Sequence, residues 1–522
     1  SPCIGSGRDS VFYQGEWFHA PDFDLGGNTK PSPIGSFPDT GAFESDRAEP
    51  IIPETLNVPS EYSSIQLALN VADSLDVVLV QPGTYYENII WPETNGIKLI
   101  SAGDTSNTII NGSGSSNVIY MNPQTIIIDT TTLIKGVRIT NGYSQSAGAG
   151  LLIINASPAL YNIQIVANIC DGNGGGMYLL NSQSTMTEVM IERNTSVRGG
   201  GAYLENSNVI FNCTNLVYNQ ASHGGGLFVL DDSAPTLNTI TFNSNAAAGN
   251  GGGIYISQGD VAATDISFIG NSAVTSGGGI YFTRGNLHIE RVTFVQNSAR
   301  NGGGIYSSNP MSCTDATFIE NQAVSSAGGY LTLGGGVFLT GNSPILERVT
   351  FERNTASPSS GYGGALYVED HCDLVMSESI FTNNTSNRGG AIYITNSAPS
   401  LTNITIQGNH ASSGGGAYLY GSDPAFEDMV CLNNSAGTGG AFFFDHASPS
   451  LIDLKLTRNM SSSWGGAIYM YYSNPSFTTT IVSSNSALSS GGGIYLSRSS
   501  PNFESSTISN NISAISGGAM YI

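Results

Sequence analysis

The sequence has 522 residues, a formal net charge of −22, 65 glycines and only 11 % charged residues, while its hydrophobic content is an ordinary 40 %. Such a chain can bury a core, which excludes global disorder, and its 17 Lys plus Arg form no cationic cluster for nucleic acid or an anionic membrane. No apolar run approaches the roughly 20 residues that cross a bilayer, so we expect no membrane insertion by this segment.

Residues 1–50 combine glycine-rich turns with scattered acids and have a linker-like composition. Asp9 lies in "GSGRDS", and Asp22 and Asp24 lie in "PDFDLGGN". Oxygen ligands on flexible loops suit calcium, although the same residues also form Asx turns. We therefore expect no cofactor, with calcium as the one alternative.

Residues 51–147 differ from the rest of the chain and predict an N-terminal cap followed by irregular coils. The segment 64–72 carries Ile65, Leu67, Ala68, Val71 and Ala72, which predicts a short amphipathic helix. A strand is expected at 77–80, before a Pro-Gly turn. An amphipathic helix can seal the open core of a solenoid.

From residue 148 onward the chain repeats a mark of two glycines, a Gly or Ala, a variable residue and an aromatic residue. Most copies are 25 to 27 residues apart. The aromatic residues are Tyr178, Tyr203, Phe228, Tyr255, Tyr281, Tyr306, Phe338, Tyr367, Tyr393, Tyr418, Phe443, Tyr469, Tyr495 and Tyr521. A weaker copy places Leu152 at the same position.

A second mark keeps step with the first and consists of an apolar residue followed three positions later by asparagine. The asparagines are Asn194, Asn219, Asn245, Asn271, Asn297, Asn321, Asn354, Asn384, Asn409, Asn434, Asn459, Asn485 and Asn511. The amide of Asn can both donate and accept along a stack, so we predict a structural Asn ladder. Asn also tolerates the left-handed conformation that sharp corners need.

Between the two marks lie short runs that alternate apolar and polar residues, such as "TLNTITF" and "LTNITI". This pattern predicts strands, two or three in each repeat, and no segment is long enough for a crossover helix. The fold class is therefore all-β: a parallel β-helix, or solenoid, with coils of about 26 residues. The glycines are expected at corners where a Cβ would crowd the next coil, or where φ is positive.

After the glycines, every second residue is aliphatic and differs between repeats, as at Leu227 and Val229. We expect these residues to face the core. The aromatic residue falls on the other parity and is expected to face outward. The predicted possible ligand-binding ladder is Tyr178, Tyr203, Tyr255, Tyr281, Tyr306, Tyr367, Tyr393, Tyr418, Tyr469 and Tyr495. The rings either stack on one another and cover the backbone, or form a stripe that binds a sugar or a partner.

Two repeats are longer than the others and contain insertions at 323–336 and 356–365. Insertions in a solenoid emerge as loops, often on the binding face, so a local site is expected there first. Cys170 and Cys431 replace Ala, Ser, Phe or Ile of other repeats, and we expect both to be small buried hydrophobes.

The segments "IQLALN", "VVLVQPGTYYENI" and "LISAGDTSNTIING" resemble the opening of right-handed β-helix proteins of the pectin-lyase superfold. The repeats after Gly148 resemble the polymorphic membrane proteins of chlamydiae, which carry recurring GGA[ILV] and FxxN tetrapeptides. Here these occur at Gly363, Gly389, Gly465, Phe242, Phe268, Phe294, Phe318, Phe351 and Phe381. The resemblance covers roughly 370 residues. It implies a right-handed single-stranded β-helix and a secreted or surface-displayed passenger, often adhesive.

Residues 1–50 look like the closing segment of a bacterial surface β-helix, although here they precede one. We therefore expect a piece of a longer protein with tandem β-helices, in which coils 148–522 continue beyond the chain end. End-to-end self-association would protect an open last coil equally well.

An enzyme of this superfold would need paired carboxylates or a cluster of acids with a basic residue. Asp231 and Asp232 form an adjacent acidic pair in "LDDSAP", which also suits a solvated turn. The Gly-His-Gly and Arg-x-Lys set of polygalacturonase-like enzymes is missing. We therefore expect no catalytic and no metal residues in the repeats, without excluding an enzyme.

The main hypothesis is an extracellular, non-enzymatic structural or adhesive rod at a cell surface, as part of a larger surface protein or fibre. Its expected partners are a host or neighbouring-cell surface, glycans or further copies of itself, and not nucleic acid. The alternative is a carbohydrate-binding module, or a polysaccharide lyase or hydrolase.

Overall fold

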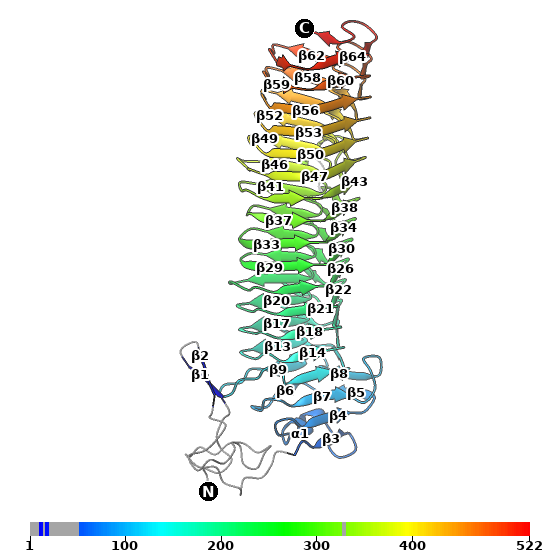
Figure 1. Ribbon diagram of the computed structural model, residues 1–522. Coiled ribbons are helices and arrows are strands. Elements are labelled where there is room, and N and C mark those ends of the chain that lie inside the picture. Colours follow the sequence, from blue (N-terminus) through cyan, green and yellow to red (C-terminus); the bar gives the residue numbers. More distant parts are fainter. Residues whose placement is uncertain (1–9, 14–15, 20–51, 326–329) are drawn as a thin grey trace.

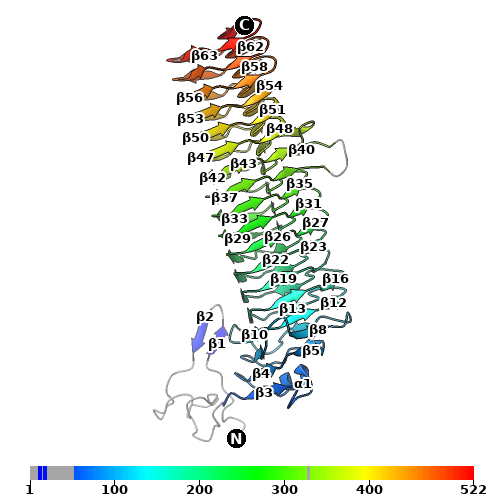
Figure 2. The same ribbon diagram turned by 90° about the vertical axis from the view of Figure 1, so that its right-hand side faces the viewer.

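The computed structural model describes residues 10–13, 16–19, 52–325 and 330–522. Strands β1 (Ser10–Tyr13) and β2 (Glu16–His19) pair antiparallel. From β3 (Thr55–Val58) onward, one continuous stack of coils forms a long rod (Figures 1 and 2). The expected parallel β-helix is confirmed. Most of residues 1–50, with Asp9, Asp22 and Asp24, lies outside the described residues, so the calcium alternative stays a prediction.

One coil in the middle of the rod contains four short strands. They are β24 (Leu227–Leu230), β25 (Thr236–Asn238), β26 (Thr241–Asn243) and β27 (Ala246–Ala247). Each strand pairs in parallel with its counterpart in the adjoining coils. We call the three resulting sheets the aromatic sheet (β24 and its counterparts), the wide sheet (β25 and β26) and the narrow sheet (β27).

The aromatic sheet runs from the first coils to the last. Its strands are β6 (Ile89–Ile90), β9 (Ile119–Met121), β13 (Leu151–Ile154), β17 (Met177–Leu180), β20 (Ala202–Glu205), β24, β28 (Ile254–Ile256), β32 (Ile280–Phe282), β36 (Ile305–Ser307), β41 (Val337–Thr340), β46 (Leu366–Glu369), β49 (Ile392–Thr395), β52 (Ala417–Tyr420), β55 (Phe442–Asp445), β58 (Ile468–Tyr471), β62 (Ile494–Ser497) and β66 (Met520–Tyr521). Equivalent residues of successive coils therefore lie directly above one another.

The coil from β24 to β27 has four strands, more than the two or three expected, because single residues with positive φ divide the chain. Thr239, with a φ of 55°, separates β25 from β26, and Ser244, also at 55°, precedes β27. Asn and Gly adopt this conformation easily, but these positions hold many residue types, so no sequence signal marks them. In later coils the two wide-sheet strands merge into one, as in β47 (Val375–Thr382) and β50 (Ser400–Gln407).

The rod begins with a short helix that covers the first coil. Helix α1 (Ile65–Leu69) has Ser64 as its N-cap, whose side chain accepts a hydrogen bond from the backbone N–H of Leu67 at 3.2 Å. The Glu87 carboxylate accepts two more N–H groups of the first turn, at 2.9 Å each. The helix is shorter than the predicted 64–72, because the chain leaves helical hydrogen bonding after Leu69.

The orientation of α1 also differs in part from the prediction. Leu67 and Val71 are about half exposed, whereas Leu69 is fully buried. Two of the five apolar residues expected to seal the core therefore face solvent. The strand expected at 77–80 is confirmed as β4 (Val77–Val80).

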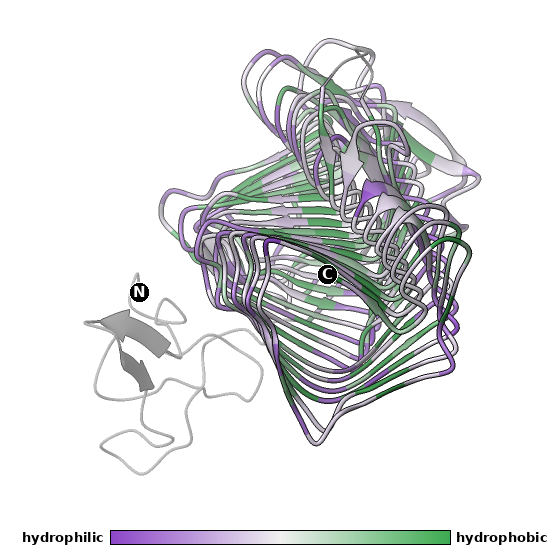
Figure 3. Cartoon of the chain, turned by 90° about the horizontal axis from the view of Figure 1, so that it is seen from above, coloured by the Kyte–Doolittle hydropathy of each residue, from purple (hydrophilic) through white to green (hydrophobic). Residues whose placement is uncertain are grey.

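The core is a narrow column of apolar side chains inside the coils. Viewed along the rod, the coils enclose this column, and hydrophobic segments of successive coils follow one another (Figure 3). The aliphatic parity predicted to face inward is buried, as at Leu227 and Val229. Six phenylalanines of the wide sheet stack in the same interior with ring centroids 4.6–4.9 Å apart. They are Phe242, Phe268, Phe294, Phe318, Phe351 and Phe381. Apolar side chains dominate this interior, and most buried polar side chains lie at the corners.

Candidate functional site

The predicted aromatic residues form one continuous stack on the outer side of the aromatic sheet. Neighbouring ring centroids are 4.6–5.3 Å apart from Tyr178 to Tyr521, with interplanar angles no larger than 30°. Strand pairing sets this spacing, because each ring is attached to the same position of consecutive coils. We call this stack the aromatic ladder.

The rings of the aromatic ladder point away from the core, yet much of their surface is covered. Tyr203 is 1 % exposed and Tyr418 is 3 % exposed. Residues before the corner glycines contribute to this cover: the Arg388 guanidinium lies 5.4 Å from the ring centroid of Tyr418, and His223 contacts Tyr255 edge-on. The ladder is therefore a second apolar cluster outside the coil.

Because each ring has a neighbour on both faces, the ladder offers a ligand its edges and hydroxyl groups. A sugar that stacks on an aromatic side chain needs an open ring face. Binding of a ligand along the aromatic ladder stays a prediction, and any such ligand would have to contact ring edges.

Several hydroxyl groups of the ladder donate hydrogen bonds to carboxylates at the far end of the adjoining strand or of their own strand. Tyr178 donates to Glu205, and Tyr418 donates to Oδ2 of Asp445 at 2.8 Å. Burial, followed by the neighbouring carboxylate, raises the pKa of both phenols. Burial likewise raises the pKa of Glu369, which accepts a hydrogen bond from Tyr367 at 2.9 Å. These acids hold phenol groups in place.

The predicted asparagines form a buried hydrogen-bonded ladder at the corner between the wide and narrow sheets. Asn297 is representative: its Oδ1 accepts from the backbone N–H and the Nδ2 of Asn271, at 3.0 and 2.9 Å. Its Nδ2 donates to the Phe268 carbonyl and to Oδ1 of Asn321, at 2.8 and 2.9 Å. Every polar atom of the side chain is thus used within the ladder.

The ladder continues without a break from Asn168 to Asn511, with 2.9–3.1 Å between amide groups. The sequence analysis missed Asn168, although "IVAN" fits the second mark. Two positions after Asn168, this repeat has Cys170 where the other repeats have Ala or Ser, so the repeat was not recognised.

The left-handed conformation at this corner belongs to the residue before each ladder asparagine. Arg193 has a φ of 54°, and Tyr218 and Ser244 each have a φ of 55°. Each of the three precedes an asparagine of the ladder. The tolerance of Asn for this conformation is used at the preceding position, as at Asn383 and Asn433, and not by the ladder asparagines themselves. The asparagine side chain must point inward to reach its partners, so the turn is made one residue earlier.

The glycines meet the steric demand expected of them. In the copy that begins at Gly277, this residue has a φ of 66°. A Cβ on Gly278 would lie 2.3 Å from the carbonyl oxygen of Gly303 in the next coil, and a Cβ on Gly279 would lie 2.7 Å from that of Gly304. The first glycine is needed for its conformation and the other two for close approach.

The remaining sequence candidates fall at corners or in the core. Asp231 and Asp232 both have positive φ and form a turn. Cys170 and Cys431 are buried, as predicted. Among the described residues, no three His, Cys, Asp or Glu side chains group as a metal site, and no helix is long and apolar enough to cross a membrane.

The two insertions form an extra pair of short strands, β40 (Thr332–Leu333) and β45 (Gly361–Tyr362), at the edge of the narrow sheet (Figure 2). Tyr362 stacks on Tyr393 of the aromatic ladder at 4.8 Å, and Arg388 lies 5.3 Å from its ring centroid. The described part of the insertions therefore thickens the cover over the aromatic ladder.

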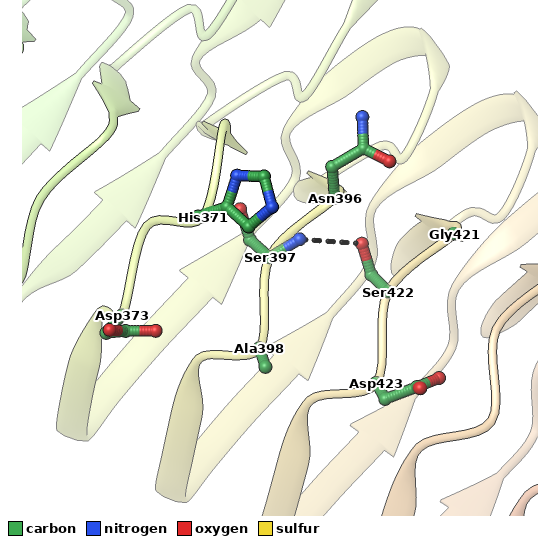
Figure 4. Close-up of a pocket in the computed structure, with 8 residues that line it drawn as sticks. All are labelled: His371, Asp373, Asn396, Ser397, Ala398, Gly421, Ser422 and Asp423. Atoms are coloured by element: carbon green, nitrogen blue, oxygen red, sulfur yellow. Dashed lines mark hydrogen bonds between the residues drawn. The ribbon is translucent and has the colours of Figure 1, made fainter.

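An open notch lies at the corner between the aromatic and wide sheets (Figure 4). Its volume is about 320 Å³, and it is lined by His371, Asp373, Asn396, Ser397, Ala398, Gly421, Ser422 and Asp423. The sequence analysis did not find it, since its residues come from three coils.

The side chains of the notch are partly committed to the fold. Ser422 Oγ accepts from the Ser397 N–H at 3.2 Å and donates to a backbone carbonyl (Figure 4). Asp423 accepts the backbone N–H of Ser448 at 2.6 Å. His371 and Asp373 remain available for a polar ligand on the open side.

Comparison with known proteins agrees with this architecture. The family model described as "Right handed beta helix region" matches residues 261–426 and 335–521, which together span half of the chain. The model of the Chlamydia polymorphic membrane protein repeat matches residues 239–257. A search of curated proteins found no match.

Among solved structures, an arginine-to-alanine mutant of the PL6-family alginate lyase AlyGC aligns with 9 % sequence identity and a TM-score of 0.23. The alignment covers 90 % of this chain and 100 % of the lyase chain. A likeness this distant carries no argument about activity.

Proposed function

This chain belongs to the right-handed β-helix family, and we propose that it forms an extracellular, non-enzymatic structural or adhesive rod at a cell surface. The rod would be part of a larger surface protein or fibre. The match to the Chlamydia polymorphic membrane protein repeat supports a surface-exposed passenger, although it spans a single coil.

The observation that carries the proposal is the uninterrupted run of ladders along the rod. Amide, aromatic and phenylalanine side chains are satisfied by copies of themselves in adjoining coils. Carboxylates on the outer face also pair with residues of the adjoining coil: Asp315 pairs with Arg348, and Glu320 pairs with Arg353. Side chains committed to their own repeats favour a load-bearing or spacing role over turnover.

Surface exposure can be tested on intact cells of the source organism. Antibodies raised against the purified chain should label unpermeabilised cells, and external protease should remove the label. Label that appears only after permeabilisation would contradict the surface proposal.

The non-enzymatic part needs a separate test. The purified chain should release no product from polygalacturonate, alginate or neutral polysaccharides, measured as new reducing ends and as unsaturated uronate absorbance. Product formation that follows the protein through purification would overturn this part of the proposal.

The notch of Figure 4 favours the second candidate, a carbohydrate-binding module or a polysaccharide lyase or hydrolase, because Asp373 and Asp423 border one open cavity. If turnover is found, Asp373→Asn and Asp423→Asn should each reduce it. Asp428→Asn, an exposed acid of the wide sheet, is the matched control.

A further inference from the structure

One row of residues, which we call the corner row, connects neighbouring coils near the start of the wide sheet. Strand pairing defines its members as Asp260, Asn286, Pro310, Ser343, Asp373, Ala398, Asp423, Ser448, Asn474 and Ser500. The backbone N–H and the Nδ2 of Asn286 both donate to Oδ1 of Asp260, at 2.8 and 2.9 Å. Asn474 Oδ1 accepts from the backbone N–H of Ser500 at 2.7 Å. An asparagine in this row can therefore donate to the preceding coil and accept from the following one.

The notch of Figure 4 lies where an alanine interrupts the corner row. Asp373, Ala398 and Asp423 follow one another in three successive coils, and Figure 4 shows Ala398 between the two acids. The Ser448 N–H donates to Oδ1 of Asp423 at 2.6 Å, so the N–H groups of this row are directed toward the preceding coil. The Asp423 N–H is directed in the same way toward Ala398, whose side chain has no acceptor. Within the described chain, neither this N–H nor the Asp373 carboxylate has a hydrogen-bond partner.

A second row of amides also loses a partner at the notch. After strand β20, the Nδ2 of Asn206 donates to Oδ1 of Asn181 in the preceding coil, at 2.7 Å. Asn396 follows β49 as Asn206 follows β20, and the two residues have φ values of 47° and 45°. The coil after Asn396 has Gly421 at this position, where a Cβ would lie 3.2 Å from Asn396 Oδ1. Asn396 lines the notch, and its amide has no hydrogen-bond partner in the part of the chain that the structure describes.

The notch therefore presents an acceptor and a donor, both left unpaired by the chain, on opposite sides of Ala398. Asp373 and Asp423 belong to coils two spacings apart, or roughly 9.6 Å. A trans amide points its N–H and its C=O in opposite directions, and with a hydrogen bond at each end it spans roughly 8 Å. A single hydroxyl group with two hydrogen bonds spans only roughly 5.5 Å. An amide outside Ala398 fits this separation better, and it would act as asparagine does elsewhere in the corner row.

The other groups of the notch indicate which amide-bearing ligand fits. The notch has a volume of about 320 Å³, the size of a site for one sugar unit, and the side chains of Asn396 and His371 suit hydroxyl groups. The eight described residues that line it include no Phe, Tyr or Trp, so recognition depends on polar groups and not on stacking. Asp373 and Asp423 disfavour an acidic sugar, on a chain whose net charge is −22. An uncharged sugar that carries an amide meets all of these conditions.

We propose that the notch binds one N-acetylhexosamine unit of a glycan, with the acetamido group outside Ala398. The acetamido N–H donates to the Asp373 carboxylate, its carbonyl oxygen accepts from the Asp423 N–H, and Asn396 and His371 contact ring hydroxyl groups. We call this arrangement the acetamide site. It deepens the carbohydrate-binding candidate named under the proposed function and rests on it, whereas the rod proposal neither requires nor supplies it.

The corner row itself suggests a variant that closes the site. Ala398→Asn introduces the side chain that the same row has at Asn474. The local sequence accommodates it, since Asn474 precedes Pro475 as Ala398 precedes Pro399. The new amide should take up the partners that the ligand uses. We expect sugar binding to weaken about tenfold or more, while the urea midpoint of unfolding stays equal or rises. Loss of binding without loss of stability separates competition for the site from unfolding.

The test uses the whole chain and saturation-transfer NMR, followed by titration. The probes are the methyl glycosides of N-acetylglucosamine and N-acetylgalactosamine, compared with methyl glucoside, methyl glucosaminide and acetamide. At least one acetamido sugar should bind about tenfold or more tightly than methyl glucoside, which lacks the amide. Asp373→Ala should weaken this binding by about the same factor. Asp260→Ala is the matched control in the corner row and should leave binding unchanged, because Asp260 is already bonded to Asn286.

Circular dichroism of each variant checks the fold. Absence of binding by both acetamido sugars, equally tight binding of methyl glucoside or of acetamide, or undiminished binding in Ala398→Asn would each overturn the proposal. Tighter binding of methyl glucosaminide would also contradict it, since the site would then prefer an ammonium group. Sugar binding that Ala398→Asn does not affect would place the carbohydrate-binding candidate elsewhere on the rod. Cell-surface labelling and the polysaccharide turnover assay would be unaffected by any of these results.

Discussion

The Asn ladder and the aromatic ladder run along the same rod, one inside the coil and one outside, and they differ in how strictly they specify residue type. From Asn168 to Asn511 the inner ladder holds asparagine in every coil. The outer ladder alternates freely between Tyr and Phe and begins with Leu152. Both repeat with the coil, yet only one repeats a single side chain.

The difference follows from the forces involved. An amide in the inner ladder must donate upward and accept from below at fixed positions, so any other side chain leaves buried partners unsatisfied. A stacked ring needs only a flat apolar neighbour about 5 Å away, which Tyr and Phe supply equally. Hydrogen-bonded ladders therefore fix chemical identity, whereas stacked ladders fix only shape.

The largest loss should come from breaking the inner ladder. Asn297→Ala removes the Oδ1 that accepts from the backbone N–H and the Nδ2 of Asn271, and it removes the Nδ2 that donates to the Phe268 carbonyl; the Asn321 amide oxygen keeps one of its two donors, the backbone N–H of residue 297. We expect a loss of about 4 kcal/mol in the free energy of unfolding, measured by urea titration. Asn286→Ala, at an exposed asparagine that bonds Asp260, is the control and should cost less than about 0.5 kcal/mol. Equal losses would contradict the comparison.

A somewhat smaller loss should follow from adding a single methyl group at a corner. Gly278→Ala places a Cβ 2.3 Å from the Gly303 carbonyl oxygen, so adjoining coils must separate locally, at a cost of about 3 kcal/mol. Gly270→Ala carries the penalty of a positive φ, which Gly278 does not have, but its Cβ meets nothing closer than 3.6 Å, and it should cost about 1 kcal/mol. Thermal unfolding of the two variants separates the steric effect from the conformational one.

The outer ladder should respond to ring removal but not to exchange of ring type. Tyr281→Ala removes a ring stacked at 4.8 and 5.0 Å on its two neighbours, and it should cost about 2 kcal/mol of unfolding free energy. Tyr281→Phe should be nearly neutral, because Phe228, Phe338 and Phe443 occupy the same ladder. A large loss in the phenylalanine variant would show that the hydroxyl, and not the stack, matters.

The same contrast explains which features of the structure could be predicted from the sequence alone. Asparagine and glycine are chemically unique, so their marks revealed the coil length, the ladder at one corner and the close approach at another. The stack of phenylalanines inside the coil was not foreseen, because an apolar residue three positions before asparagine predicts burial but not ring alignment.

Features made by unlike residues could not be foreseen in the same way. Residues as different as Arg193, Tyr218 and Ser244 share one left-handed position, and only their coil neighbours show it. The notch of Figure 4 is lined by unlike residues of three successive coils, so its lining changes at each step along the rod. Such steps become visible only once the register is known.

The smallest effect should be the contribution of the outer ladder to the dependence of stability on alkaline pH. Burial raises the pKa of Tyr203 and Tyr281 to about 12, whereas an unfolded tyrosine titrates near 10. Between these values the unfolded chain releases phenolic protons that the folded chain retains, so stability falls as pH rises from about 10 to about 12. The tyrosinate ultraviolet absorbance should rise in this range with unfolding. Tyr281→Phe removes one such phenol and should flatten the decline, while Asn286→Ala should leave its slope unchanged, because an amide does not titrate. An identical slope in Tyr281→Phe would mean that the ladder phenols do not govern it.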